Sequence, residues 1–292
     1  MTRLSGILSV REKCDGGDVA DRVTEDPPGW MGGTSHLVLL IHGYNNNVDE
    51  ARAAFSGLTS VLPDRFPKVG WFYWPGDADL GWFDFLDFIS YPTEIEDAKT
   101  SAKRLEDTLV RVASENPGIE VTLVGHSLGC RLIAECIHGL AAKPDQAPRI
   151  KALILMAAAL PVELVGAGSP LGQSMRRIVP EGYIFYSERD RVLQVAFPAG
   201  QTLAAGMGYE TEVYLEAVGR HGNPQNLFPQ PAEARHDNGH SEYWEDSKIA
   251  ARLKDIGGAV TSRATEFSVI PDKRETPERS TPRYAVGSCS FY

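Results

Sequence analysis

The stretch Glu120-Val121-Thr122-Leu123-Val124-Gly125-His126-Ser127-Leu128-Gly129 decides the fold. An apolar run of strand length leads directly into the pattern Gly-x-Ser-x-Gly, and a helical run over 128–140 follows. In this setting the pattern predicts a strand–turn–helix elbow that exposes a nucleophilic serine, Ser127. Residues 125 and 129 must be small because side chains there would clash across the turn. A glycine-rich turn with a serine helix cap is the alternative interpretation.

Strand and helix patterns alternate on both sides of this elbow. Short apolar runs predict buried strands at 36–41, 70–74, 120–124, 151–157, 182–186 and 212–217. Longer runs predict helices at 48–62, 91–114, 128–140, 192–203 and 243–253. This order predicts an α/β fold: a single domain with a mostly parallel central sheet, helices on both faces, and a small cap or none.

The two ends of the chain differ from this pattern. Residues 1–35 are mixed and rich in Gly and Pro; they have room for a short strand or two but predict mostly an irregular lead-in. Residues 264–292 are rich in polar residues and Pro and predict an irregular tail. The catalytic domain is therefore expected at 36–263.

Composition and charge narrow the class of protein. The 292 residues are 42% hydrophobic and 23% charged, as in globular domains, and the net charge of −10 disfavours binding to nucleic acid. No apolar run approaches the roughly 20 residues of an integral membrane segment. The four cysteines fit no zinc or redox spacing, so neither a metal nor a cofactor is predicted. Reduced thiols favour a cytoplasmic location, although export without a leader would leave the same sequence.

A nucleophilic serine needs a base to accept its proton. In folds with this elbow the base is a histidine that follows the acid in the chain. His240 is the preferred candidate because it lies in a loop after the last predicted strand and before a helix. His236, in the same loop, and His221 are the alternatives.

The acid that orients the histidine is expected after the strand 182–186. Asp190 is preferred, because a carboxylate a few residues past the end of that strand lies at the catalytic edge of the sheet. Glu188 is the nearest alternative. Asp190 could instead cap the helix that follows it.

Acyl transfer also needs two N–H donors for the developing oxyanion. The backbone N–H of Leu128 is one expected donor, because it follows the nucleophile. The second is expected from the loop after the strand 36–41, where Gly43 permits close approach and the N–H of Tyr44 is the candidate. The asparagines at 45–47 can also be a loop and cap cluster before the next helix.

Five stretches together resemble a known family: 38–45, 72–75, 125–129, 190–193 and 239–244. The chain resembles the α/β-hydrolase superfamily and, more narrowly, bacterial α/β hydrolases of the DUF900 type. The resemblance implies a triad of Ser127, Asp190 and His240 and a role as a serine hydrolase.

The substrate side of the predicted site is aromatic. Trp82, Phe83 and Phe85 follow the end of a strand and could form the wall of an acyl pocket, with core packing as the alternative. Asn45 and His126 are further pocket candidates. The favoured function is cleavage of a small-molecule or lipid ester through an acyl-enzyme. The alternatives are acyl transfer to another acceptor and a non-catalytic interaction protein on a hydrolase fold.

Overall fold

The computed structural model describes residues 4–13, 17–44, 47–62, 68–76, 91–228, 233–235 and 238–258. Its strands are β1 (Leu4–Arg11), β2 (Val19–Asp26), β3 (His36–Ile41), β4 (Lys68–Tyr73), β5 (Glu120–His126), β6 (Arg149–Met156), β7 (Gly182–Tyr186) and β8 (Glu233–Arg235). They form an eight-stranded sheet in the order β2-β1-β4-β3-β5-β6-β7-β8. Only the β1–β2 pair is antiparallel among these neighbours, so the predicted mostly parallel α/β sheet is confirmed.

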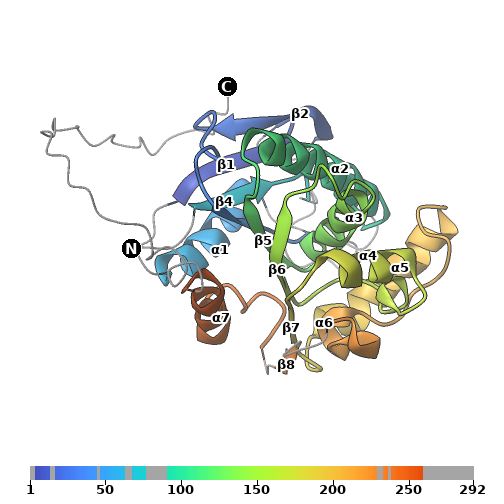
Figure 1. The fold of residues 1–292 in the computed structure, drawn as a ribbon. Coiled ribbons are helices and arrows are strands. Elements are labelled where there is room, and N and C mark those ends of the chain that lie inside the picture. Colours follow the sequence, from blue (N-terminus) through green and yellow to red (C-terminus); the bar gives the residue numbers. More distant parts are fainter. Residues whose placement is uncertain are drawn as a thin grey trace, which may run out of the picture.

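Helices cover both faces of this sheet (Figure 1). The helices are α1 (Val48–Ser60), α2 (Tyr91–Glu115), α3 (Gly129–Ala141), α4 (Pro170–Ile178), α5 (Phe197–Gly206), α6 (Val218–His221) and α7 (Ser247–Gly258), with short turns η2 (Glu163–Val165), η3 (Val192–Ala196) and η4 (Pro224–Asn226). Helices α1 and α7 lie on one face, and α2 and α3 lie on the other. The connection from β6 to β7 holds only η2 and α4, so it carries no large cap.

The central strands explain why the sequence predicts this fold so directly. Every residue of β3 is buried, as expected for a parallel strand covered on both faces. Helix α1 begins where an asparagine can cap it: the Asn47 side chain accepts hydrogen bonds from the N–H groups of Asp49 and Glu50. Asn47 therefore has the capping role that the sequence offered for this cluster.

The expectation of a mostly irregular lead-in over residues 1–35 is wrong for Leu4–Arg11 and Val19–Asp26, which are strands. Strands β1 and β2 extend the sheet beyond β4. Gly6 breaks the apolar pattern of β1 because Trp30 lies across it: a Cβ on Gly6 would lie 2.3 Å from the indole, and one on the paired Gly70 would lie 2.1 Å from it. The glycine marks a close approach of a ring to the strand and does not end the strand.

The predicted strand at 212–217 is also wrong. That segment is not a strand, and only Ala217 forms an isolated bridge, with Pro161. Its alternating pattern buries Tyr214 and leaves Val213 and Leu215 exposed at 49% and 60%. The open edge of β7 is taken by the short polar strand β8, which gives no apolar signal in the sequence.

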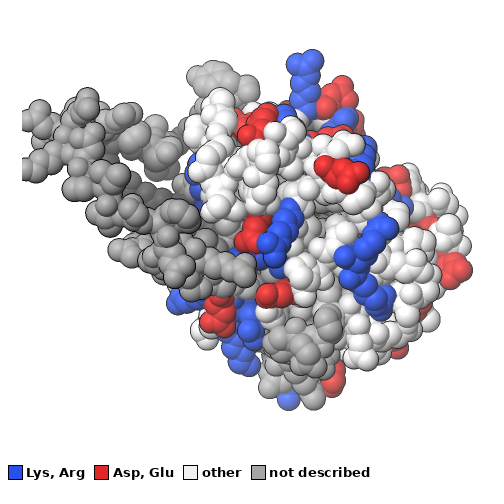
Figure 2. All heavy atoms as spheres, in the orientation of Figure 1, with Lys and Arg blue, Asp and Glu red and all other residues white. Residues whose placement is uncertain are grey.

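The remaining elements lie near their predicted positions, although the last helix begins at Ser247 and not at Tyr243. The tail at 264–292 lies outside the described residues. None of the described helices is both long and apolar enough to cross a lipid bilayer. Figure 2 shows basic and acidic side chains interspersed over the described part of one face, so the net charge of −10 is not gathered into one patch on that side.

Candidate active site

The turn after β5 holds Ser127 in a backbone conformation that L-residues rarely adopt. Its φ is +50°, in the left-handed region. The neighbouring strand β6 supports the turn, because the N–H of Ser127 donates to the carbonyl of Met156 at 3.0 Å and the N–H of Ala159 donates to the carbonyl of Ser127 at 3.1 Å. Ser127 is 6% exposed. These backbone hydrogen bonds therefore fix the position of the Ser127 hydroxyl.

Three glycines allow the elbow to form. A Cβ on Gly129 would lie 2.2 Å from the backbone oxygen of His42, and one on Gly125 would lie 2.6 Å from the side chain of Ile133. A Cβ on Gly43 would lie 2.8 Å from the Cβ of Ser127. Real Cβ atoms do not come this close to other atoms, so a side chain at 129 or 43 would clash with the backbone of His42 or with the Cβ of Ser127, and one at 125 would require the end of the Ile133 side chain to move.

Gly129→Ala is expected to destabilise the protein by about 1–3 kcal/mol, because the new methyl group meets an immobile backbone carbonyl. Urea denaturation measures the free energy of unfolding. Gly206→Ala, at the end of α5, is the matched control, since a Cβ there would meet no atom within 4 Å. A loss below about 0.5 kcal/mol at position 129, as for an ordinary surface change, would contradict this packing.

The structure brings Ser127, His240 and Asp190 together. His240 Nε2 lies 2.9 Å from Ser127 Oγ, and His240 Nδ1 lies 2.7 Å from Asp190 Oδ2. The three residues come from the ends of β5 and β7 and from the loop before α7, which meet at one edge of the sheet. Each distance is that of a direct hydrogen bond.

Asp190 is fully buried and has a partner for each carboxylate oxygen. Oδ2 faces His240, and Oδ1 accepts a hydrogen bond from the N–H of Leu193 at 3.0 Å. Leu193 lies in the first turn of η3. Asp190 therefore makes the contacts that both sequence interpretations require: the carboxylate satisfies an N–H at the start of a helix and also lies against His240 Nδ1.

The alternatives to His240 and Asp190 lie elsewhere. His221 is half exposed and pairs with Glu216 at 3.5 Å. Glu188 is exposed, and its backbone carbonyl accepts a hydrogen bond from Arg220. His236 lies outside the described residues. Neither described alternative is part of the hydrogen-bonded group around Ser127.

The loop after β3 is oriented by His42, for which the sequence suggested no role. His42 Nδ1 donates to the carbonyl of Gly43 at 2.8 Å, while Nε2 accepts from the N–H of Trp74 at 3.3 Å. Burial lowers the pKa of His42 to about 3, so the ring stays neutral. In a trans peptide the N–H points opposite to the C=O, so the N–H of Tyr44 points away from His42. The only feature of the sequence that could have indicated this role of His42 is its position directly before Gly43.

His126, a pocket candidate in the sequence, contacts the loop that carries His240. Its side chain is buried, and Nε2 lies 2.7 Å from the backbone oxygen of His240. The rings of His240, Tyr243 and Trp244 surround it at 5.0, 6.2 and 5.8 Å between centroids. His126 thus contacts both the backbone and the ring of His240.

The other pocket candidates, Asn45, Trp82, Phe83 and Phe85, lie outside the described residues. The two expected oxyanion donors belong to described residues: Leu128 directly follows Ser127 at the start of α3, and Tyr44 directly follows Gly43. Tyr44 also contacts Tyr91 edge-on at 6.1 Å.

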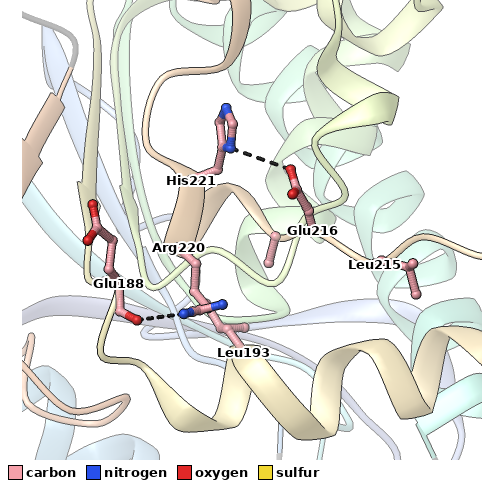
Figure 3. Close-up of a pocket in the computed structure, with 7 residues that line it drawn as sticks. Glu188, Leu193, Leu215, Glu216, Arg220 and His221 are labelled. Carbon is pink, nitrogen blue, oxygen red and sulfur yellow. Dashed lines mark hydrogen bonds and ion pairs between the residues drawn. The ribbon is translucent and has the colours of Figure 1, made fainter.

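The loop after β7 that carries Asp190 is called the acid loop. A cavity of about 280 Å³ lies between this acid loop and α6 (Figure 3). Glu188, Leu193, Leu215, Glu216, Ala217, Arg220 and His221 line it. It borders the acid loop through Glu188 and Leu193, but neither Ser127 nor His240 lines it. The cavity is therefore separate from the candidate nucleophile.

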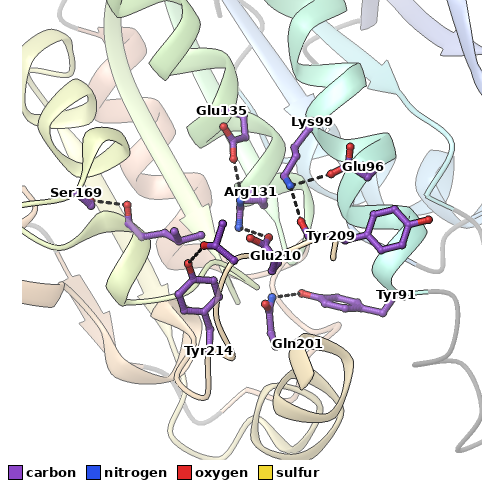
Figure 4. A network of polar contacts seen from close by, with 12 residues as sticks. Tyr91, Glu96, Lys99, Arg131, Glu135, Ser169, Gln201, Tyr209, Glu210 and Tyr214 are labelled. Carbon is purple, nitrogen blue, oxygen red and sulfur yellow. Dashed lines mark hydrogen bonds and ion pairs between the residues drawn. The ribbon is translucent and has the colours of Figure 1, made fainter. Parts of the chain in front are cut away.

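Ion pairs and a hydrogen bond hold the long connection after β7 against α2 and α3 (Figure 4). Arg131 of α3 forms ion pairs with Glu135 at 2.8 Å and with Glu210 at 3.1 Å. Lys99 of α2 donates to the carbonyl of Tyr209 at 3.0 Å. These contacts fix the far end of the connection that begins with the Asp190 loop.

The parallel sheet with a serine elbow after its central strand β5 and an acid loop after β7 defines the class: this is an α/β hydrolase. More specifically, the chain belongs to the DUF900 family, described as alpha/beta hydrolases of unknown function, whose profile matches residues 32–205, more than half of the chain. The resemblance noted in the sequence is confirmed. No curated protein matches the chain.

Solved structures with a similar arrangement are distant in sequence. The lin2722 gene product of Listeria innocua is 12% identical, with 80% of this chain and 96% of that chain covered and a TM-score of 0.44. Acyl-protein thioesterase 2 of Zea mays is 15% identical, with 77% and 95% covered and a TM-score of 0.40. Carboxyl esterase 2 of Tuber melanosporum is 11% identical, with 78% and 80% covered and a TM-score of 0.43.

Proposed function

We propose that this protein is a serine hydrolase that cleaves carboxylic esters through an acyl-enzyme intermediate. The observation that carries the proposal is the continuous hydrogen-bonded chain from Ser127 through His240 to Asp190, with distances of 2.9 and 2.7 Å. A serine hydroxyl is a poor nucleophile alone, and a histidine within hydrogen-bond reach that is itself oriented by a carboxylate activates it.

Each residue then has a defined step. Ser127 Oγ attacks the ester carbonyl while His240 Nε2 takes its proton, and Asp190 stabilises the imidazolium that forms. The N–H groups of Tyr44 and Leu128 donate to the oxyanion of the tetrahedral intermediate. His240 returns the proton to the leaving alcohol. Water, deprotonated by the same histidine, then attacks the acyl-enzyme and releases the acid.

The substrate class in this proposal is a small-molecule or lipid ester, and no metal or cofactor takes part in the steps above. A cytoplasmic location belongs to the same proposal. It is supported by Cys130 and Cys136, which are both buried free thiols.

A fluorophosphonate probe tests the proposal directly, because it phosphonylates only an activated serine. Intact-mass and peptide analysis of the wild type should show one adduct, on Ser127. Ser114→Ala, at the exposed end of α2, should label fully. A wild type that stays unlabelled, or that labels at another serine, would favour a non-catalytic role. With p-nitrophenyl esters and added alcohol, a transesterified product in place of free acid would favour acyl transfer.

A further inference from the structure

A second histidine lies directly behind the candidate base. His126 precedes Ser127 in the elbow, and its Nε2 is 2.7 Å from the backbone oxygen of His240. His126 is 5% exposed and His240 is 15% exposed in its side chain, so the contact is shielded from water. The contact joins residues 114 positions apart in the sequence. It connects the elbow that holds Ser127 to the loop that carries His240.

The chemistry of this contact defines the state of the His126 ring. A carbonyl oxygen only accepts hydrogen bonds, so Nε2 must carry the proton. Burial, together with the adjacent His240, lowers the pKa of His126 to about 3, which leaves the ring neutral and Nδ1 unprotonated. No hydrogen-bond partner for Nδ1 is found among the described residues. Gly43 packs against that side, since a Cβ there would lie 2.9 Å from Nδ1.

We propose that His126 is a positioning residue that holds the backbone of His240 and thereby keeps the imidazole within reach of both Ser127 and Asp190. The inference rests on the proposed function and assigns His126 to the base in place of the substrate pocket. Loops are the least rigid mounts for catalytic groups, and a shift of about 1 Å can cost about 100-fold in rate. A hydrogen bond from the rigid elbow fixes the separation of nucleophile and base.

A neutral donor suits this position better than a charged one. The titratable groups that face His126 are His240, Asp190, His42 and Tyr243. The His240 ring becomes an imidazolium during the reaction, with its centroid 5.0 Å from that of His126. A second cation at that distance in a buried site would oppose proton transfer. A neutral imidazole donates the hydrogen bond without that repulsion.

A pair of variants separates the hydrogen bond from simple space filling. His126→Leu removes the donor, and His126→Gln keeps an N–H at a similar distance from Cα. We expect kcat to fall about 100-fold in His126→Leu, with KM changed less than about threefold, and to remain within about tenfold in His126→Gln. His138→Leu, which removes another histidine side-chain contact, to Ser174, is the matched control and should retain wild-type kcat. Equal losses in the Leu and Gln variants would overturn the proposal.

A double-mutant cycle tests whether His126 acts through His240. If it does, adding His126→Leu to His240→Ala should change the remaining rate by less than about twofold, because the side chain that it positions is already absent. A further loss of about 100-fold would show a role in folding or substrate binding and would contradict the positioning role.

Histidine NMR tests the same contact without substrate. Long-range proton–nitrogen spectra of the wild type should show the Nε2–H tautomer for His126 from pH 5 to 8, assigned by its loss in His126→Gln. The downfield proton between His240 Nδ1 and Asp190 should persist in His126→Gln and disappear in His126→Leu. An Nδ1–H tautomer, or an unchanged downfield proton in the Leu variant, would refute the positioning role. The spectra need no turnover, so this result is independent of whether any ester is cleaved.

Discussion

Ser127→Ala is expected to lower kcat for p-nitrophenyl ester hydrolysis by about 10⁶-fold. The variant loses the atom that is proposed to form the acyl-enzyme, and no neighbouring hydroxyl replaces it in the hydrogen bond to His240 Nε2 among the described contacts. The residual rate should come from the oxyanion donors and from substrate binding. Steady-state kinetics at saturating ester, with a correction for spontaneous hydrolysis, measures the change.

Stability should change little in the same variant, because the substitution removes one oxygen from a site that is 6% exposed. Unfolding curves of Ser127→Ala and the wild type should therefore overlap within about 1 kcal/mol. Ser114→Ala should retain wild-type kcat. Retention of more than a tenth of wild-type kcat in Ser127→Ala would place the nucleophile elsewhere and would contradict the proposed function.

Asp190→Asn is expected to lower kcat by about 10⁴-fold. The N–H of Leu193 donates to one side of this group at 3.0 Å, so the amide oxygen of the asparagine should face Leu193. The NH₂ group then faces His240 Nδ1 in place of Oδ2. A donor at that position forces Nδ1 to accept, which puts the imidazole proton on Nε2, opposite Ser127. The histidine is then in the wrong tautomer to act as a base.

Glu188→Gln is the matched control for Asp190→Asn. It is the same chemical change two residues earlier in the same loop, on an exposed side chain, and it should leave kcat within about twofold. The two variants also separate the two acids considered from the sequence. A loss of about 10⁴-fold in Glu188→Gln, with an active Asp190→Asn, would reverse the assignment of the acid.

Much of the fold could be predicted because its central elements are locally distinct. The fully buried strand His36–Ile41 and the elbow at Ser127 each have a pattern that is typical of a parallel sheet covered on both faces. The edges of the sheet could not be predicted in this way. The apolar pattern of strand β1 is interrupted by Gly6, which makes room for Trp30, a residue distant in sequence. At the other edge, the polar strand β8 displaced the better-patterned segment 212–217.

The candidate site likewise has residues that the sequence predicts and contacts that it does not. Ser127, Asp190 and His240 follow from chain order and from their positions after strands and in loops, and the hydrogen bonds among them agree with that placement. The contacts of His42 and His126 could not be predicted. Both are buried neutral rings that hold backbone carbonyls, and nothing in their neighbouring residues reveals which carbonyl.

The amino-acid sequence by itself determined the class of fold, the elbow and the order of the three candidate catalytic residues, because apolar periodicity and glycine spacing act within a few residues of the chain. Only the tertiary structure decided which strands close the edges of the sheet and which histidine holds the loop of the base. These choices depend on ring packing and hydrogen bonds between segments that lie up to 114 residues apart. Such a contact stabilises the protein only when both segments are in place. The sequence of one segment alone therefore does not predict it.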